Sequence, residues 1–278
     1  MSEVKKIATR DSYGNALVEL GKEHEDLIVL DADLAAAGKV PFASSFAMFA
    51  AGRAFEQIRN SVAYPHLNVK IGATHAGISV GEDGATHQCN EDIALMRSIP
   101  GMVVINPSDD VEARAAVKAA YEYEGPVYLR FGRLAVPVIN DREDYKFEMG
   151  KGVVLREGKD LTIVASGLPV ANCLEVAEKL SAEGIEAKVI NIHTIKPLDE
   201  DLIVAAAKET GKVVTVEEHS VIGGLGSAVC DALSAKAPTQ VQKIGVNDVF
   251  GESGPALELL KKYGLDTDGI YEKMKAFL

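Results

Sequence analysis

Short apolar runs that predict β-strands alternate with helix-like patterns along this 278-residue chain, and that alternation constrains the fold more than any other feature. LIVL at residues 27–30 and NVKIGA at residues 68–73 have strand length, and segments with helical apolar periodicity lie between such runs. Strands that alternate with helices predict parallel sheets whose two faces are covered by helices. The expected fold class is therefore α/β, with mainly parallel sheets in three-layer domains.

The alternation falls into two series, which predicts two domains. The first series ends with the strand-like PVYLR at residues 126–130, and the second opens with LTIVASG at residues 161–167. The stretch at residues 137–151 lacks clear periodicity and is interpreted as the linker. A chain of this length with 47% hydrophobic residues can form two cores. We expect domains at residues 1–140 and 141–278.

The charge and cysteine content exclude several classes of function. The formal net charge is -12, from 41 acidic and 29 basic residues, which argues against a nucleic acid or an anionic membrane as partner. Cys89, Cys173 and Cys230 form no CxxC pair and are expected to be reduced thiols. The first residues lack the apolar segment of a signal peptide, and no apolar run has the length of a membrane span. We expect a cytoplasmic protein.

The polar loop THAGISVGEDGATHQ, at residues 74–88, is the strongest candidate for a functional site. It follows the strand predicted at residues 68–73, and ligands of parallel sheets bind beyond the carboxyl ends of strands. Imidazoles suit proton transfer near neutral pH, and carboxylates can orient hydroxyl groups. A surface loop without function is the alternative, but long ordered loops are usually functional. The imidazoles, carboxylates and hydroxyls of the loop belong to Thr74, His75, Ser79, Glu82, Asp83, Thr86 and His87.

The sequence does not predict a metal site in this chain. His75 and His87 lack the spacing of a helical HExxH pair, and no cysteine completes a zinc set. The glycine-rich GGLGSAV at residues 223–229 could present backbone N–H groups to an anion. Close packing of a strand on a helix is the favoured interpretation of that turn, because a lone glycine-rich turn is a weak signal.

Aromatic and arginine residues supply further candidates. Phe46 and Phe49 have helical spacing, and such a pair is more often part of a core than a ligand platform. A phosphate site would need at least one arginine, because guanidinium groups bind phosphate in a bidentate manner. The candidate arginines are Arg10, Arg53, Arg130 and Arg133.

Taken together, these motifs resemble the C-terminal section of transketolase, and the likeness covers nearly the whole chain. The loop ATHAGISVGEDGATHQ makes it specific, because it resembles the loop of the family's pyrimidine-binding domain. The other motifs that carry the likeness are ATR at residues 8–10, DADL at 31–34, GPVYLRFGR at 125–133, SGLPVA at 166–171, VINIHTIKPLD at 189–199 and VEEHSVIGGLGSAV at 216–229. The resemblance implies a pyrimidine-binding domain followed by a transketolase C-terminal domain.

The resemblance also implies roles that the composition could not give. Phe46 and Phe49 would pack against the aminopyrimidine ring of thiamine diphosphate, which reverses their interpretation as core, and Asp33 would border the cofactor. His87 would move protons near the reacting carbon, and Asp83 would orient a substrate hydroxyl. The sugar phosphate would be bound by His75, Arg10 and Arg133. The implied reaction, of the kind used in the pentose phosphate pathway, transfers a two-carbon ketol unit from a ketose phosphate to an aldose phosphate.

Two departures from the family qualify this expectation. The sequence contains no GDG motif followed at a distance by Asn, so the diphosphate and its Mg²⁺ or Ca²⁺ would be bound by a separate N-terminal subunit. DADLA also runs directly into AAGKVPF, where the family has a segment with a GIAEQ-like motif whose Glu activates the cofactor. We expect about 30 further residues in the natural polypeptide between Asp33 and Gly38, on the scale of a βαβ connection.

The expected consequence is a chain that is inactive alone and that self-associates as a dimer or tetramer in the absence of its partner. The alternatives are a subunit of a related thiamine diphosphate enzyme, either deoxyxylulose-phosphate synthase or the beta subunit of a 2-oxo acid dehydrogenase, and a non-catalytic homologue. The two histidines of the GEDGATHQ loop favour transketolase, whereas the absent Glu segment favours the non-catalytic homologue.

Overall fold

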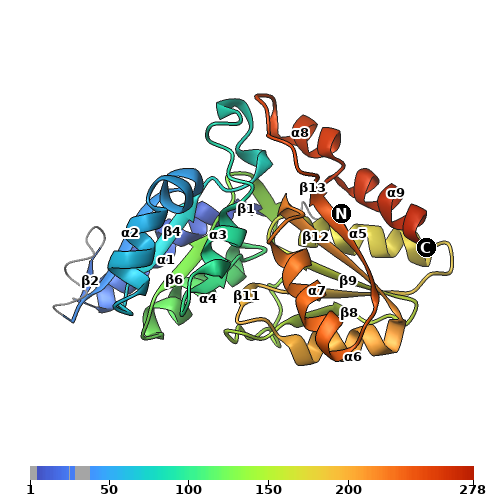
Figure 1. Cartoon of the computed structure of the whole chain (residues 1–278), viewed down its shortest axis with the longest axis horizontal. Helices are drawn as coiled ribbons and strands as arrows, with labels where there is room; N and C mark the ends of the chain where they lie inside the picture. The colour runs from blue at the N-terminus through green and yellow to red at the C-terminus, as the bar shows by residue number, and fades with distance from the viewer. Residues whose placement is uncertain (1–4, 25, 29–37) are drawn as a thin grey trace.

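The structure is a computed structural model that describes residues 5–24, 26–28 and 38–278. It confirms the α/β prediction, because two mainly parallel sheets carry helices on both faces (Figure 1). Within the described residues, no helix is both long and apolar enough to cross a membrane.

The first sheet is built mostly from the N-terminal half and has the strand order β11-β5-β6-β4-β3-β2. Its strands pair in parallel, except for β11, which is antiparallel to β5. The strands from this half are β2 (Leu27–Ile28), β3 (Val40–Phe46), β4 (Lys70–Thr74), β5 (Val103–Ile105) and β6 (Val127–Arg130).

Alternating side chains on these strands face two different layers of helices. On β6, Val127 and Leu129 pack with α1 (Thr9–Glu23) and α4 (Asp110–Glu122). Tyr128 points to the opposite layer. That layer is formed by α3 (Asp92–Ser98) and by the run η2 (Met48–Arg53), α2 (Phe55–Gln57) and η3 (Ile58–Ala63). This run follows β3 and contains π-helical turns in η2 and η3.

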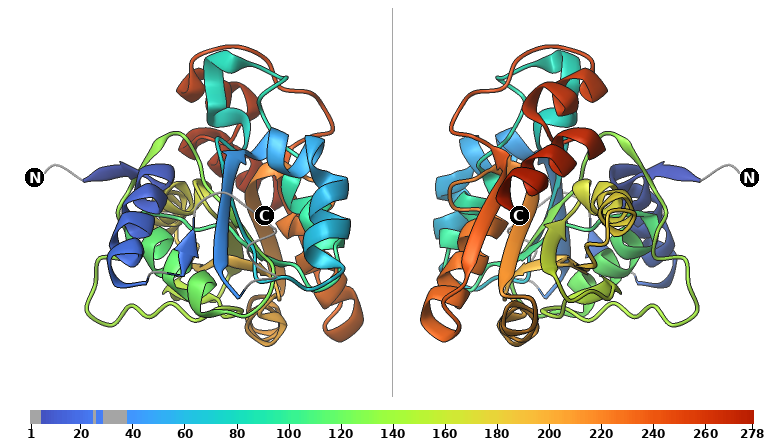
Figure 2. Two further views of the ribbon diagram at one scale, coloured as in Figure 1. Left: turned by 90° about the vertical axis from the view of Figure 1, so that its left-hand side faces the viewer. Right: turned by 90° about the vertical axis from the view of Figure 1, so that its right-hand side faces the viewer.

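The second sheet has the order β13-β12-β9-β10-β8, with only β8 antiparallel to its neighbour. Helices α5 and α9 pack together over one face and α6 and α7 over the other (Figures 1 and 2). The strands are β8 (Val153–Arg156), β9 (Leu161–Ser166), β10 (Ala187–Asn191), β12 (Lys212–Ser220) and β13 (Gln240–Val246). The helices are α5 (Pro169–Ser181), α6 (Glu200–Thr210), α7 (Leu225–Lys236), α8 (Ala256–Tyr263) and α9 (Thr267–Phe277).

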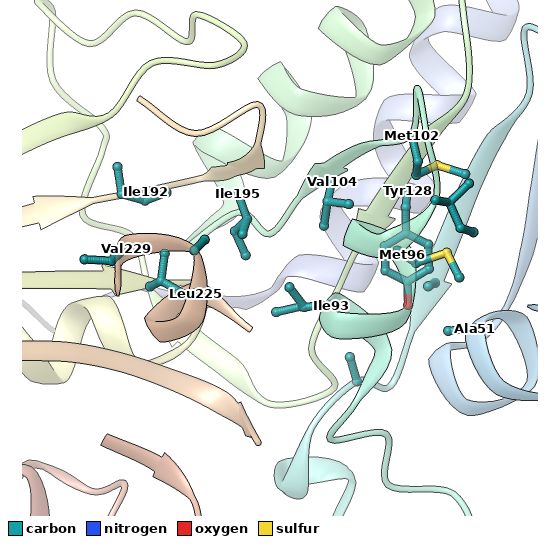
Figure 3. Close-up of a cluster of buried hydrophobic side chains, with 14 of the residues drawn as sticks. Ala51, Ile93, Met96, Met102, Val104, Tyr128, Ile192, Ile195, Leu225 and Val229 are labelled. Carbon is teal, nitrogen blue, oxygen red and sulfur yellow. The ribbon is translucent and has the colours of Figure 1, made fainter. Parts of the chain in front are cut away.

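The two halves share one continuous hydrophobic core. Figure 3 shows Ile93 and Val104 of the N-terminal half next to Ile195 and Leu225 of the C-terminal half. The strand β11 (Thr194–Lys196) also leaves the C-terminal half to pair with β5. This strand was not predicted, and neither was the antiparallel pair of β1 (Lys6–Ala8) and β7 (Ala135–Pro137). The C-terminal half is therefore fixed directly against the sheet that carries the polar loop.

Candidate active site

The sheet register brings the candidate residues together at one edge. Phe46, at the end of β3, is paired with Thr74, at the end of β4. On the other side of β4, Ala73 is paired with Arg130 of β6. Because these strands are parallel, their carboxyl ends meet at the same edge. His75 follows β4 directly, and Arg133 lies shortly after the end of β6. The structure therefore gathers, at the predicted edge, residues that are far apart in the sequence.

Four partly exposed aromatic rings form the centre of this edge. The His75 ring stacks on Phe46, with 3.9 Å between centroids and 13° between planes. The rings of Phe46 and Phe49 are also nearly parallel, with centroids 5.9 Å apart. His87 presents its ring at 74° to both, 6.1 Å from Phe46 and 5.3 Å from Phe49. Partly exposed aromatic side chains of this kind can pack against a further flat heteroaromatic ring.

His75 is held as a neutral imidazole. Arg10 Nη1 lies 2.7 Å from His75 Nε2, and because a guanidinium can only donate, Nε2 must accept. The proton is then on Nδ1, which lies 3.0 Å from Thr74 Oγ1. Burial lowers the pKa of His75, and the positive charges of Arg10 and Arg133 lower it further. His75 thus holds Arg10 at the site without adding a charge of its own.

The backbone of His75 adopts a conformation that is rare for a residue with a side chain. Its φ angle is 55°, in the left-handed region. Non-glycine residues in this region carry a strain that the surrounding structure must maintain, and such residues cluster at functional sites. The unusual backbone conformation of the turn after β4 therefore places the His75 imidazole at the site.

Arg133 connects the loop to the end of β6. Its Nη1 donates to the carbonyl of Val80 at 2.5 Å and lies 3.3 Å from Glu82 Oε2. The Arg133 side chain remains 38% exposed and can still bind a ligand. Asp83 follows in the sequence with an exposed side chain, and its charge acts on the pKa of His75 in the opposite sense to the two arginines.

His87 lies at the far end of the loop, where its Nδ1 is 2.9 Å from Thr86 Oγ1. Of the predicted site residues, Arg10, Phe46, Phe49, His75, Asp83, His87 and Arg133 thus belong to one described region of the molecule. Asp33, and the sequence junction between Asp33 and Gly38, lie outside the described residues.

Two arginines differ from the sequence-based expectation. Arg130 is 3% exposed, and its Nε donates to Asp92 Oδ2 at 2.8 Å, so it serves the core and is not available to a phosphate. Asp92 also accepts the hydroxyl of Tyr128, whose pKa burial raises well above its usual value. Arg53 lies 4.6 Å from the centroid of Phe49, a cation–π contact that its spacing from Phe49 on one helix could have suggested.

The glycine-rich turn before α7 is filled by the protein itself. The carboxylate of Glu217 accepts the backbone N–H groups of Leu225 at 2.7 Å and Gly226 at 2.8 Å. These are the groups that an anion at this helix N-terminus would use. Close packing, the favoured interpretation of GGLGSAV, is therefore what the structure shows.

Across residues 5–24, 26–28 and 38–278, there is no group of three or more His, Cys, Asp or Glu side chains that could hold a metal ion. The chemistry of the described site consists of imidazoles, guanidiniums, carboxylates and aromatic rings.

Comparisons with known proteins point to one family. The family described as transketolase, pyrimidine binding domain, matches residues 34–138, and the transketolase C-terminal domain family matches residues 150–270. A candidate transketolase C-terminal section of Methanocaldococcus jannaschii is 47% identical, covering 95% of this chain and 94% of its own length. A 6-deoxy-6-sulfo-D-fructose transketolase subunit of a Clostridium species is 44% identical over 89% of this chain and 77% of its own length.

A solved structure is similar over nearly its whole length. It is described as a split gene transketolase, an inactive β4 tetramer. It superimposes with a TM-score of 0.91 at 50% identity, covering 97% of this chain and 98% of its own. The alignment with the M. jannaschii protein runs over 301 positions, more than the 278 residues of this chain, so that relative has residues where this chain has none.

Proposed function

This chain belongs to the transketolase family, and on that premise we propose that it transfers a two-carbon ketol unit from a ketose phosphate to an aldose phosphate as the C-terminal subunit of a two-subunit transketolase. The observation that carries the proposal is the ring cluster of Phe46, Phe49, His75 and His87, with Arg10 bonded to His75. It combines an aromatic surface, proton-transfer groups and a cation at one sheet edge. We propose domain limits at residues 1–140 and 141–278.

The ring cluster fits the pyrimidine end of thiamine diphosphate, because nearly parallel, partly exposed rings can pack against a flat heteroaromatic ring. Phe46 and Phe49 would hold that ring, and Asp33 would border it. When bound, the cofactor supplies the stabilisation of a carbanion that the protein's own side chains cannot provide. The residues of this chain contribute binding, orientation and proton transfer.

His87 is assigned to proton transfer, because its ring stands on edge beside both phenylalanines and remains partly exposed. An imidazole at this place can give or take a proton near neutral pH. Asp83, exposed on the same loop, is assigned to orienting a substrate hydroxyl.

The phosphate of the substrate is assigned to Arg10, His75 and Arg133. The two guanidiniums carry the positive charge, and both lower the pKa of the neutral His75. Charged donors of this type bind phosphate oxygens strongly, and the planar guanidinium can do so with two bonds. Because Arg133 is already bonded to Val80, its position depends on the loop.

The partner is a separate N-terminal transketolase subunit, which would bind the diphosphate and its Mg²⁺ or Ca²⁺. The M. jannaschii relative, matched over 94% of its length, supports a subunit of this extent. The β4 tetramer described for the solved relative supports self-association when the partner is absent. We further propose that the protein acts in the cytoplasm.

The cofactor-activating Glu must come from the segment that the sequence lacks between DADLA and AAGKVPF. The longer alignment with the M. jannaschii protein supports such a segment in relatives, because that protein has residues where this chain has none. We therefore propose that the chain becomes active when about 30 residues of the family's connection are present and the N-terminal subunit is added.

A ketol-transfer assay tests the proposal. The chain alone, the chain with an N-terminal subunit, and the chain carrying the restored segment with that subunit are compared with a ketose phosphate and an aldose phosphate. Transfer is expected only in the third mixture. The same three mixtures are also tested with a 2-oxo acid in place of the ketose phosphate. Decarboxylation of the 2-oxo acid without ketol transfer would assign a deoxyxylulose-phosphate synthase or dehydrogenase subunit, and no turnover of either type would assign a non-catalytic homologue.

A further inference from the structure

The C-terminal half of the chain encloses the active-site loop without supplying any of the residues assigned to chemistry. The Ser220 N–H donates to the carbonyl of Asn90 at 2.7 Å, and Gln88 Nε2 donates to the carbonyl of Glu252 at 2.8 Å. Helix α8 lies beside the 3₁₀ turn at residues 78–83, where Gly81 approaches Gly254 (Figures 1 and 2). The loop is therefore held by contacts from the second domain.

Among these contacts, one carboxylate reaches directly into the loop. Glu218 Oε1, from the end of β12, accepts the backbone N–H of Ser79 at 2.6 Å. The carboxylate also lies against Gly77, because a Cβ added to Gly77 would come within 2.4 Å of the same oxygen. Gly77 has a φ of 83°, so the close approach and the backbone conformation both require glycine here.

Glu218 is itself fixed in place. It is 3% exposed, and Arg130 Nη2 donates to its backbone carbonyl at 2.9 Å. Burial raises the pKa of Glu218, whereas Arg130 and the bond from Ser79 act to lower it. Burying a carboxylate without hydrogen bonds costs free energy of folding. The hydrogen bond that Glu218 accepts from the Ser79 N–H is therefore a specific arrangement.

The position of the loop has consequences for the substrate residues. Ser79 is followed by Val80, whose carbonyl is bonded to Arg133, and the same turn ends at Asp83. A shift of this turn would displace one residue assigned to the phosphate and one assigned to a substrate hydroxyl. The ring of His87 lies beyond the turn and packs against Phe49.

The geometry points to Glu218 as a positioning residue, which holds residues 77–83 so that Arg133 and Asp83 can bind the sugar phosphate. This assigns to the C-terminal domain a role in substrate binding and rests on the proposed function. The step involves no bond making or breaking by Glu218, only an accepted hydrogen bond. Its loss should therefore raise the KM for phosphorylated substrates and leave kcat nearly unchanged.

Two substitutions separate the hydrogen bond from the volume and charge of Glu218. Glu218→Gln removes the charge but keeps an oxygen that can accept the Ser79 N–H. Glu218→Met keeps much of the volume but removes the acceptor. Glu217→Gln is the matched control, because the preceding carboxylate is also buried but bonds the N-terminus of α7.

The first readout is hydrogen exchange of residues 76–88 in the full chain, which needs no partner subunit. Glu218→Met should speed exchange about tenfold, because the buried Ser79 N–H loses its acceptor. Glu218→Gln should stay within about threefold of the parent chain. Glu217→Gln should leave residues 76–88 unchanged and affect residues 223–229 instead.

The second readout is the KM for a phosphorylated ketose in the assembled enzyme with the restored segment. Glu218→Met should raise it about tenfold, with kcat changed less than about threefold. The assignment would be overturned if Glu218→Met and Glu218→Gln changed the exchange of residues 76–88 equally. It would also be overturned if the Glu217→Gln control sped the exchange of these residues as much as Glu218→Met. If the parent enzyme has no ketol transfer, the proposed function fails, and the exchange experiment still decides whether Glu218 holds the loop.

Discussion

The ends of β4 and β12 show how similar local sequences can take opposite roles. Each strand leads to a histidine, His75 after β4 and His219 within the end of β12, and then to a glycine-containing turn. His75 is partly exposed, has a φ of 55° and bonds Arg10. His219 is fully buried, with its Nδ1 2.7 Å from the carbonyl of Ser220. One strand end is open to a ligand and the other is closed.

The difference lies in what fills the space beyond each strand. At β12, Glu217 satisfies two backbone N–H groups of α7, which removes the positive end of that helix as a binding site. At β4, the space beyond the strand is bordered by rings and guanidiniums that remain partly exposed. In this chain, a glycine-containing turn next to a histidine can therefore bind a ligand only where the protein does not itself occupy the hydrogen-bond donors of the turn.

The largest expected effect removes the proton-transfer group from the open end. His87→Ala, in the assembled enzyme with the restored segment, should lower kcat by roughly a hundredfold or more, since general acid–base groups contribute on this scale. His24→Ala is the control, because it lies at the opposite end of α1, about 20 Å from Arg10 at 1.5 Å per residue. Steady-state kinetics would contradict the assignment if both variants lost turnover equally.

The matching change at the closed end should affect stability and spare binding. Glu217→Ala leaves the N–H groups of Leu225 and Gly226 without their acceptor, so the free energy of unfolding should fall by about 2 kcal/mol or more. Denaturant unfolding measures this loss. If Glu217→Ala left the stability unchanged but altered the KM, the end of β12 would also bind a ligand, and the contrast between the two strand ends would be wrong.

The next effect is expected in substrate affinity. Arg133→Ala should raise the KM for phosphorylated sugars about tenfold and change that for free sugars little, because one charge-assisted contact is lost. Arg142→Ala is the control, since Arg142 lies in the segment between the two matched family domains, near Asp144. Kinetics with paired phosphorylated and unphosphorylated ketoses decide the matter, and equal losses for both substrates would remove Arg133 from the phosphate site.

The smallest effect concerns the charge of His75. Burial, Arg10 and Arg133 lower its pKa below 6.5, so the folded chain binds fewer protons here than the unfolded chain. The stability that this provides is complete above pH 6.5 and is lost as the pH falls through the lowered value. Arg10→Gln removes one cause and should raise the pKa of His75 in an NMR titration. An unchanged value would show that Arg10 does not act on the imidazole.

Much of this arrangement could be predicted because it follows from local patterns. Alternating strands and helices gave the fold class, and the polar loop after a strand gave His75, Asp83 and His87. The pairing of β3 with β4 cannot be seen in the sequence, so the stack of His75 on Phe46 was not predicted. The same is true of Glu218, whose partner Ser79 is 139 residues away.

Other features depend on long-range partners that composition does not reveal. β11 is a three-residue strand that pairs with a strand of the other half. Arg130 was a candidate phosphate ligand in the sequence, but it is paired with the buried Asp92. The resemblance reversed the core interpretation of Phe46 and Phe49, and both rings are in fact only partly buried. The candidate site residues could thus be predicted from the sequence, whereas the residues that hold them in place could not.

We propose that the open end of β4 is one half of a cofactor site whose other half belongs to a separate subunit. Calorimetric titration of thiamine diphosphate and Mg²⁺ tests it most directly, into the chain alone and into its mixture with the N-terminal subunit. We expect weak or undetectable binding to the chain alone and tight, Mg²⁺-dependent binding to the mixture. Tight Mg²⁺-dependent binding to the chain alone would contradict it.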